Sequence, residues 1–316
     1  MTWRAAALPD CEEWGLELNT AERAEFASLL ANADSAIPDL RTRLLWIRDR
    51  LETGAGVVLL RNLPIADSAE PAVRGAFLRL ASEIGTALSQ AADGSRIFSV
   101  RDAGFAKDDP RARGPNTSKR LSFHTDRCDV IGFLCLQDAM HGGDNEIVNS
   151  RAVYERIALE RPDLLEILKQ PFYYKRHTVD LGNAQPWCQQ PIFSFCEGQF
   201  ACSFLRVLIE RAHADPALPS LTDLQVEALD FLEDTAAKPD LFLRFRQHPG
   251  DLLLLNNWAI LHRRTAFEDW PEPERRRHIL RAWLAVPNSR PLDPMFAANY
   301  GDVRAGAIRG GMREQA

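Results

Sequence analysis

The strongest constraint on the fold is a long succession of short strand-like segments in the later two thirds of the chain. Runs rich in aromatic or aliphatic residues lie at 96–101, 130–136, 171–176, 191–195, 200–204, 241–246, 252–255 and 278–286. The segments 252–255 and 278–286 are apolar at nearly every position, which is typical of buried strands. This pattern favours a mostly β fold with flanking helices, and a double-stranded β-helix (a cupin-like jelly roll) fits the number of strands.

The beginning of the chain has a different pattern. Apolar residues recur at three- and four-residue spacing in 20–32, 38–53 and about 68–84, which predicts three helices, with a strand at 56–61 between the last two. No internal repeat or convincing linker interrupts the sequence. We therefore expect one domain over 1–316, with a mainly helical part at about 1–85.

Two further helices are expected among the strands. One follows Ser150 as its N-cap and breaks at Arg161-Pro162. The other begins after Thr222, which forms a capping box with Gln225. The loop 102–120 is long and aperiodic, as lids and binding loops often are.

Composition excludes some classes of function. A formal charge of −6 and a pI near 5.7 argue against general binding to nucleic acid or anionic membranes. No apolar run is long enough for a membrane span, and the first residues lack a secretory signal. The six cysteines show no CxxC pair, so we expect reduced thiols and a cytoplasmic protein. A homo-oligomer is left open.

Three residues form a candidate metal site. In a strand, His124 and Asp126 would project to the same face, and His262 follows an apolar segment far downstream. Two imidazoles and one carboxylate are the ligands that hold non-heme Fe(II) and leave three coordination positions open. One HxD sequence alone is weak support, since such a triplet is nearly expected by chance in a chain of this composition.

An arginine in an apolar strand strengthens this interpretation. Arg281 shares a face of the segment 278–286 with Ile279 and Trp283, and burying its charge without an anion would be costly. A planar guanidinium binds carboxylates in a bidentate manner, so an oxo-dicarboxylate cosubstrate is a natural partner. Arg277 lies on the same face. The alternative is a structural ion pair with an Asp or Glu.

These residues belong to four blocks that resemble the TauD/TfdA family of oxygenases. The blocks are 123–126 (FHTD), 142–145 (GGDN), 256–267 (NNWAILHRRTAF) and 276–281 (RRHILR), and they keep the family's order across roughly half the chain.

The resemblance implies a jelly-roll fold with Fe(II) bound by His124, Asp126 and His262, and Arg281 paired with the far carboxylate of 2-oxoglutarate. It also implies cosubstrate contacts from Asn145, Arg264 and Arg277. Asn145 departs from the family's usual Thr after the Gly-Gly-Asp turn. The gap between His262 and Arg281 is longer than usual and is filled by an exposed insertion at 268–274.

The predicted function is that of an Fe(II)- and 2-oxoglutarate-dependent dioxygenase. It would use O2 to oxidise, and most simply hydroxylate, a small-molecule substrate, with release of succinate and CO2. No catalytic residue is predicted beyond the metal centre. Two alternatives stay open: a jelly-roll metal enzyme that uses the same ligands for hydrolysis or isomerisation, and a non-catalytic metabolite-binding protein.

The substrate's charge is left open by the sequence. Basic residues near the first motif (Arg101, Lys119, Arg120 and Arg127) favour an anion, whereas Asp102 and Asp129 could bind an amine.

Overall fold

The computed structural model of the 316-residue chain describes residues 2–91, 93–105, 114–177, 180 and 183–312. Within these ranges helices and strands contribute together to a mixed α/β fold, with more helix than the sequence pattern predicts. Among the described residues, every helix is too short or too polar to cross a membrane. The centre of the expected 102–120 loop, 106–113, lies outside the described residues.

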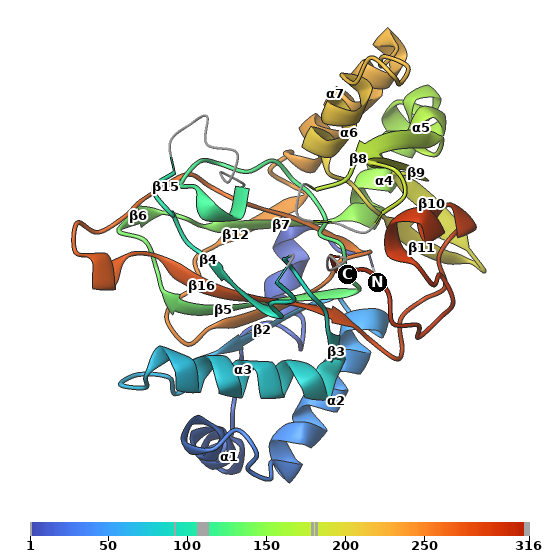
Figure 1. The fold of residues 1–316 in the computed structure, drawn as a ribbon. Helices are drawn as coiled ribbons and strands as arrows, with labels where there is room; N and C mark the ends of the chain where they lie inside the picture. The colour runs from blue at the N-terminus through green and yellow to red at the C-terminus, as the bar shows by residue number, and fades with distance from the viewer. Residues whose placement is uncertain (1, 92, 106–113, 178–179, 181–182, 313–316) are drawn as a thin grey trace.

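Three helices form a layer at one side of the molecule, at the bottom of Figure 1: α1 (Thr20–Ala31), α2 (Pro38–Thr53) and α3 (Glu70–Ile84). Asn19 and Glu22 begin α1 with reciprocal side-chain to backbone hydrogen bonds, a capping box. Gly54 caps the end of α2. Apolar side chains of these helices share one core with the large sheet above them, so the helices cover one of its faces.

The large sheet has the strand order β1-β2-β13-β5-β16-β3, and β4 also pairs with β16. Its strands are β1 (Leu16–Glu17), β2 (Val57–Arg61), β3 (Thr86–Ala87), β4 (Ile97–Val100), β5 (Val130–Gln137), β13 (Leu252–Asn256) and β16 (His278–Ala285). Along β16, Leu280 and Ala282 face the helical core. Because side chains alternate along a strand, Arg281 faces the opposite side.

A three-stranded sheet with the order β12-β7-β14 carries the distal histidine. Its strands are β7 (Asn145–Asn149), β12 (Phe242–Phe245) and β14 (Ile260–Arg264). A separate antiparallel pair consists of β6 (His141–Gly142), which precedes β7 in the chain, and β15 (Phe267–Glu268), which follows β14. The register sets His262 opposite Ile147 and Arg264 opposite Asn145.

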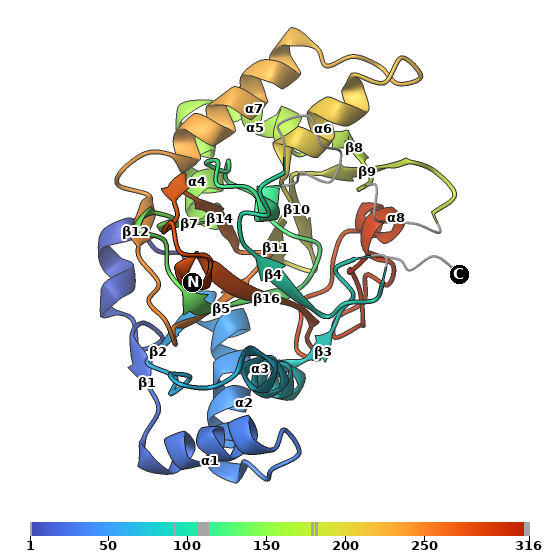
Figure 2. The same cartoon turned by 60° about the vertical axis from the view of Figure 1, so that its left-hand side comes forward.

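The remaining elements gather at the end of the molecule away from α1, as Figures 1 and 2 both show. They are α4 (Ser150–Glu160), α5 (Pro162–Leu168), α6 (Arg206–His213), α7 (Asp223–Ala236), and the strand pairs β8 (Pro171–Lys175) with β9 (Trp187–Pro191) and β10 (Phe193–Cys196) with β11 (Gln199–Cys202). Short 3-10 helices lie at Ala5–Asp10, Gly114–Asn116 and Pro273–Arg275.

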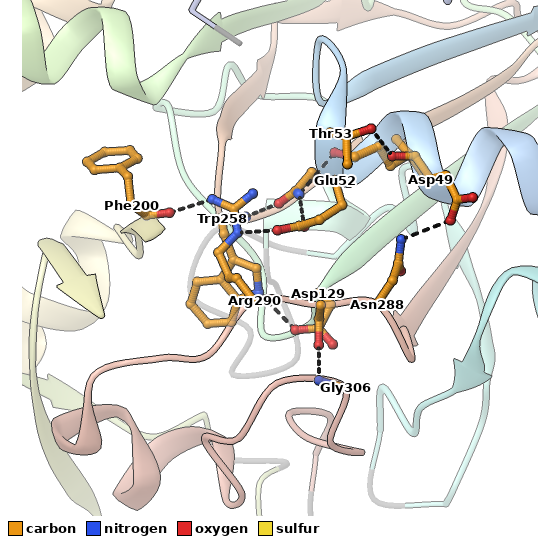
Figure 3. Close-up of polar contacts among 12 residues, drawn as sticks. Asp49, Glu52, Thr53, Asp129, Phe200, Trp258, Asn288, Arg290 and Gly306 are labelled. Atoms are coloured by element: carbon orange, nitrogen blue, oxygen red, sulfur yellow. Dashed lines mark hydrogen bonds and ion pairs between the residues drawn. The ribbon is translucent and has the colours of Figure 1, made fainter. Parts of the chain in front are cut away.

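The chain beyond β16 returns across the molecule through a 3-10 helix (Pro294–Phe296) and α8 (Ala297–Tyr300). Figure 3 shows how this segment is attached. Arg290 donates to Glu52 on α2 at 2.8 Å and to the carbonyl of Phe200, and Asn288 contacts Asp49.

Several expected elements are present and some details differ. The helix after Asn149 begins one residue earlier than predicted, because Asn149 and not Ser150 accepts the capping bond from Ala152. His262 lies in the middle of β14 and not at a strand end. His124 is not in a strand and makes only an isolated bridge to His262. The described strands form separate sheets, so closure into a jelly roll remains a prediction.

Candidate metal centre

Two backbone hydrogen bonds bring the distant histidines together. His124 N donates to His262 O and His262 N donates to His124 O, each at 3.0 Å. This isolated antiparallel bridge sets the two imidazole centroids 4.4 Å apart. Asp126 lies on the same loop as His124, and one ligand atom from each of the three residues lies within 4.8 Å of the others. The three predicted ligands therefore converge.

Each imidazole is oriented by its surroundings. His124 Nδ1 lies 2.9 Å from the carbonyl oxygen of Ser122, a contact that favours the proton on this nitrogen and leaves Nε2 available to a metal. His262 Nε2 lies 3.7 Å from Asp126 Oδ2. His262 Nδ1 is buried without a hydrogen-bond partner among the described residues.

Protonation in the site suits metal binding. Burial is the largest cause that lowers the pKa of His262, to about 3, helped by His124 and Arg281 and opposed by Asp126. Burial alone would raise the pKa of Asp126, but Arg281 and then the two histidines hold it below its ordinary value. At neutral pH the site therefore offers a neutral imidazole at 262 and a carboxylate at 126, which is the donor set that Fe(II) takes.

Arg281 stands beside this centre. Its Nη1 is 3.4 Å from Asp126 Oδ2, and its Nε donates to Gln90 Oε1 at 2.7 Å. Gln90 also donates to the backbone carbonyl of Arg281 at 2.9 Å. The guanidinium carbon lies 4.6 Å from the ring centre of Trp283 and 5.2 Å from that of Phe98. The contacts with Gln90 and the two rings fix the orientation of the Arg281 guanidinium, and the 3.4 Å contact with Asp126 neutralises only part of its charge.

Two more arginines reach the same cavity. Arg277 and Arg264 are 5% and 4% exposed, and neither makes an ion pair among the described residues. Each has a buried Nη1 without a hydrogen-bond partner. Burial lowers the pKa of Arg277 to about 10 and, with repulsion from Arg277, that of Arg264 to about 9. Two buried guanidinium groups without an ion-pair partner among the described residues favour the binding of an anion in this pocket.

The cavity between these groups lies directly against the candidate metal ligands. Its polar lining consists of His124, Asp126, Asn145, Gln247, His262, Arg263, Arg264, Arg277 and Arg281. Asn145 donates to Gln247 at 3.0 Å, and Gly143 packs so closely on Arg277 that a Cβ there would lie 3.2 Å from its Nε. All four predicted cosubstrate residues therefore border one cavity.

A second, larger cavity of about 510 Å³ also borders His124, Asp126 and Arg281. His177, Arg206, Arg211, Trp283 and Met312 contribute to its wall. His177 is partly buried and lines this cavity.

The charged residues proposed around the first motif separate into different environments. Arg120 borders the larger cavity. Arg127 pairs with Asp180, and Arg101 and Asp102 line a different pocket. Asp129 is 1% exposed and pairs with Arg309 at 2.7 Å, so its carboxylate is already occupied and is not exposed to a substrate amine.

Sequence reasoning missed Asn257, which supports the loop that carries Asp126. Its Oδ1 accepts from Asp126 N at 2.8 Å, and its Nδ2 donates to Asp126 O and, at 3.0 Å, to Cys128 O. The block 256–267 contained this residue, but no periodicity distinguished it from its neighbour Asn256. Gln90 was missed because its partner, Arg281, is 191 residues away.

Comparisons with known proteins agree with this geometry. The family model described as "Taurine catabolism dioxygenase TauD, TfdA family" matches residues 27–283. Among curated relatives, the FR-33289 synthase of Streptomyces rubellomurinus is 26% identical over 325 residues, covering 96% of this chain and 95% of that protein. The taurine hydroxylase-like protein SAT17 of Stachybotrys chartarum is 27% identical over 328 residues, covering 94% and 84%.

Solved structures share the fold. An asparagine oxygenase in complex with Fe(II), 2S,3S-3-hydroxyasparagine and succinate superposes with a TM-score of 0.67 at 18% identity, covering 86% of this chain and 93% of that one. The non-heme iron oxygenase OrfP, in complex with Fe and alpha-ketoglutaric acid, gives a TM-score of 0.59 at 14% identity, covering 85% and 93%.

Proposed function

The chain belongs to the TauD/TfdA family and is a dioxygenase dependent on Fe(II) and 2-oxoglutarate, and from this we propose that it hydroxylates a small-molecule substrate. In the proposed reaction a substrate C–H bond, 2-oxoglutarate and O2 give the C–OH product, succinate and CO2. One oxygen atom enters the product and the other enters succinate. The observation that carries the proposal is the convergence of three buried arginines on a cavity bordered by the His124, Asp126 and His262 side chains.

We propose that His124 Nε2, an Asp126 carboxylate oxygen and His262 Nε2 hold the Fe(II). Bound there, the ion would supply O2 activation coupled to oxidative decarboxylation of the cosubstrate. The protein's own contribution is positional. The Ser122 carbonyl fixes the His124 ring, and Asn257 fixes the backbone of Asp126.

The three arginines of the cosubstrate pocket can be assigned to the two carboxylates of 2-oxoglutarate. Arg281 contacts Asp126, which supports placing it against the 2-oxoglutarate carboxylate nearer the metal, in place of the far carboxylate expected from the sequence. Arg277 and Arg264, which lack ion-pair partners among the described residues, would then bind the far carboxylate. A dianion would relieve the repulsion among these buried guanidinium groups.

The larger cavity is the proposed substrate site, because it borders His124 and Asp126 and its volume of about 510 Å³ is enough for a small molecule. Relatives are named for different substrates, including gamma-butyrobetaine and uridine-5'-phosphate. The cavity itself carries both charges, with Arg120 and Arg211 against Glu210 and Glu233. A polar small molecule is the class that this lining supports.

Succinate release in the presence of a metabolite library tests the proposal. The purified protein with Fe(II), 2-oxoglutarate and O2 should form succinate faster with its substrate than alone, and one hydroxylated product should appear per succinate. The Arg277→Ala variant should lose this activity at low 2-oxoglutarate concentration. Turnover of a substrate that needs neither O2 nor 2-oxoglutarate would favour hydrolysis or isomerisation instead. Metabolite binding without any succinate would favour a binding protein.

A further inference from the structure

The family match ends at residue 283, but the chain beyond it returns to the metal centre. Residues 309–312 pass between two backbone segments that support the site. Gly311 N donates to Arg127 O and Met312 N donates to Ser89 O, each at 2.8 Å. Met312 then lines the larger cavity beside Asp126. This short stretch, here called the 309–312 segment, therefore connects two parts of the site that are 38 positions apart in the sequence.

On one side the 309–312 segment holds the loop that carries Asp126. Arg127, whose carbonyl accepts from Gly311, is the residue after Asp126. Gly310 has a φ of +82° and lies so close to the Arg127 carbonyl that a Cβ at residue 310 would collide with it. Arg309 is 2% exposed, and its Nε donates to Asp129 Oδ1 at 2.7 Å. The 309–312 segment therefore contacts the chain one and three residues after Asp126.

On the other side the segment holds the support of Arg281. Ser89, whose carbonyl accepts from Met312, precedes Gln90, which binds both the side chain and the backbone carbonyl of Arg281. Gly311 packs on the same stretch, where an added Cβ would lie 3.1 Å from Leu88 Cβ and 3.2 Å from Ser89 O. Hydrogen bonds therefore connect the Asp126 loop to the 309–312 segment, and that segment to the stretch 89–90 that holds Arg281.

We propose that the 309–312 segment positions the Asp126 loop relative to Arg281 and so sets the affinity for both metal and cosubstrate. The inference rests on the proposed function, since it takes Asp126 as a metal ligand and Arg281 as a cosubstrate contact. Ligand geometry in metal sites is sensitive to the residues that hold the ligands, and loss of such support typically costs about 10- to 100-fold in metal affinity. The segment acts through other residues and touches no reacting atom.

Three glycine-to-alanine variants isolate this role. Gly310→Ala pushes on the Arg127 carbonyl, and Gly311→Ala pushes on Leu88 and Ser89. Gly198→Ala is the matched control, because Gly198 lies in the turn between β10 and β11, has a φ of +77° and has nothing within 4 Å of an added Cβ. All three variants place an alanine at a positive φ, so each is expected to lose some stability from backbone strain.

The readouts are anaerobic Fe(II) and 2-oxoglutarate titrations, the absorption spectrum of the Co(II)-substituted protein, and thermal unfolding. Gly310→Ala should raise the Kd for Fe(II) about tenfold and change the Co(II) spectrum. Gly311→Ala should weaken 2-oxoglutarate binding more than Fe(II) binding. Gly198→Ala should bind both ligands as the unaltered protein does, even where its melting temperature falls.

Equal Fe(II) and 2-oxoglutarate affinities in all three variants would overturn the inference and leave the segment a structural element only. Should Gly310→Ala fail to fold, the comparison of Gly311→Ala with Gly198→Ala decides, and equal 2-oxoglutarate affinities there would overturn it. Failure of the unaltered protein to bind Fe(II) at all would instead contradict the proposed function, so the two failures are distinguishable.

Discussion

Nη1 of Arg281 lies 3.4 Å from Oδ2 of Asp126, so the candidate acidic metal ligand is also the nearest carboxylate to a buried cation. The contact has opposite consequences for the binding of Fe(II) and of 2-oxoglutarate. A fixed positive charge beside the metal position disfavours a cation and favours a chelating anion. Binding of the cosubstrate carboxylate should therefore relieve Asp126 of part of its interaction with Arg281.

Arg281→Ala should separate the two affinities. Loss of a buried charge-assisted pair costs at least ~2 kcal/mol, so the Kd for 2-oxoglutarate should rise about 30-fold or more. The Kd for Fe(II) should stay the same or fall, because a like charge has been removed from beside the metal. Anaerobic titrations measure both constants. Arg276→Ala, which removes an exposed arginine from the preceding turn, is the control, and equal 2-oxoglutarate affinity in the two variants would remove Arg281 from the pocket.

The double change His124→Ala with Asp126→Ala should abolish iron retention. It removes two of the three converging ligands and leaves the backbone bridge between residues 124 and 262 in place, so the protein should remain folded. Iron per chain after anaerobic desalting should fall from about one to near zero. His141→Ala, at an exposed histidine, should retain its iron. Undiminished loading of the double variant would refute the ligand assignment.

Local patterns predicted much of this structure because they depend on neighbouring residues. The capping box at Thr222 and the start of β13 at Leu252 follow from spacing and apolar content alone. The helix α6 was missed, because eight residues are too few for a clear helical periodicity. Its first residue, Arg206, forms ion pairs with Glu210 in the same helix and with Asp230 and Glu233 on α7. The sequence motifs likewise identified residues whose side chains converge. They could not identify Asn257 or Gln90, whose roles arise from contacts across more than 100 positions.

Acid should destabilise the protein partly through Glu146. Its side chain is fully buried, and although burial raises its pKa, hydrogen bonds from Arg263 and Arg244 hold the pKa below its ordinary value. A carboxylate with a lowered folded-state pKa stabilises the protein above its unfolded pKa of about 4.3, and this contribution is lost as pH falls through the folded value. Glu146→Gln should therefore lower the free energy of unfolding by about 2 kcal/mol at pH 7. This is less than for a fully buried ion pair, because the two arginine side chains are partly exposed to solvent.

Urea unfolding at several pH values tests this expectation. The difference in unfolding free energy between Glu146→Gln and the unaltered protein should be constant from pH 7 to about 5 and should shrink below about 4.3. A difference that grows as the pH falls would contradict the assigned direction of the pKa shift.

The buried pair of Asp129 and Arg309 should be costly to break from one side. Both side chains are almost fully buried, and Asp129 also accepts from Trp258 Nε1 at 2.8 Å. Arg309→Met leaves the carboxylate without its cation and should cost about 3–5 kcal/mol. Adding Asp129→Asn to that variant removes the stranded charge and should recover part of the loss, which urea unfolding would show. Equal stability of the single and double variants would mean that the pair contributes little.

Adjacent asparagines allow a matched test of support for the metal loop. Asn257 makes its three described side-chain hydrogen bonds with the backbone of 126–128. Asn256 bonds instead to Leu51, Glu52 and Trp258, none of which lines either cavity. Both side chains are buried, so Asn257→Ala and Asn256→Ala should each lose stability by about 1–3 kcal/mol. Only Asn257→Ala should raise the Kd for Fe(II), by about tenfold, because only it frees the Asp126 backbone. Equal Fe(II) affinity in two equally destabilised variants would show that the loop holds Asp126 without help from Asn257.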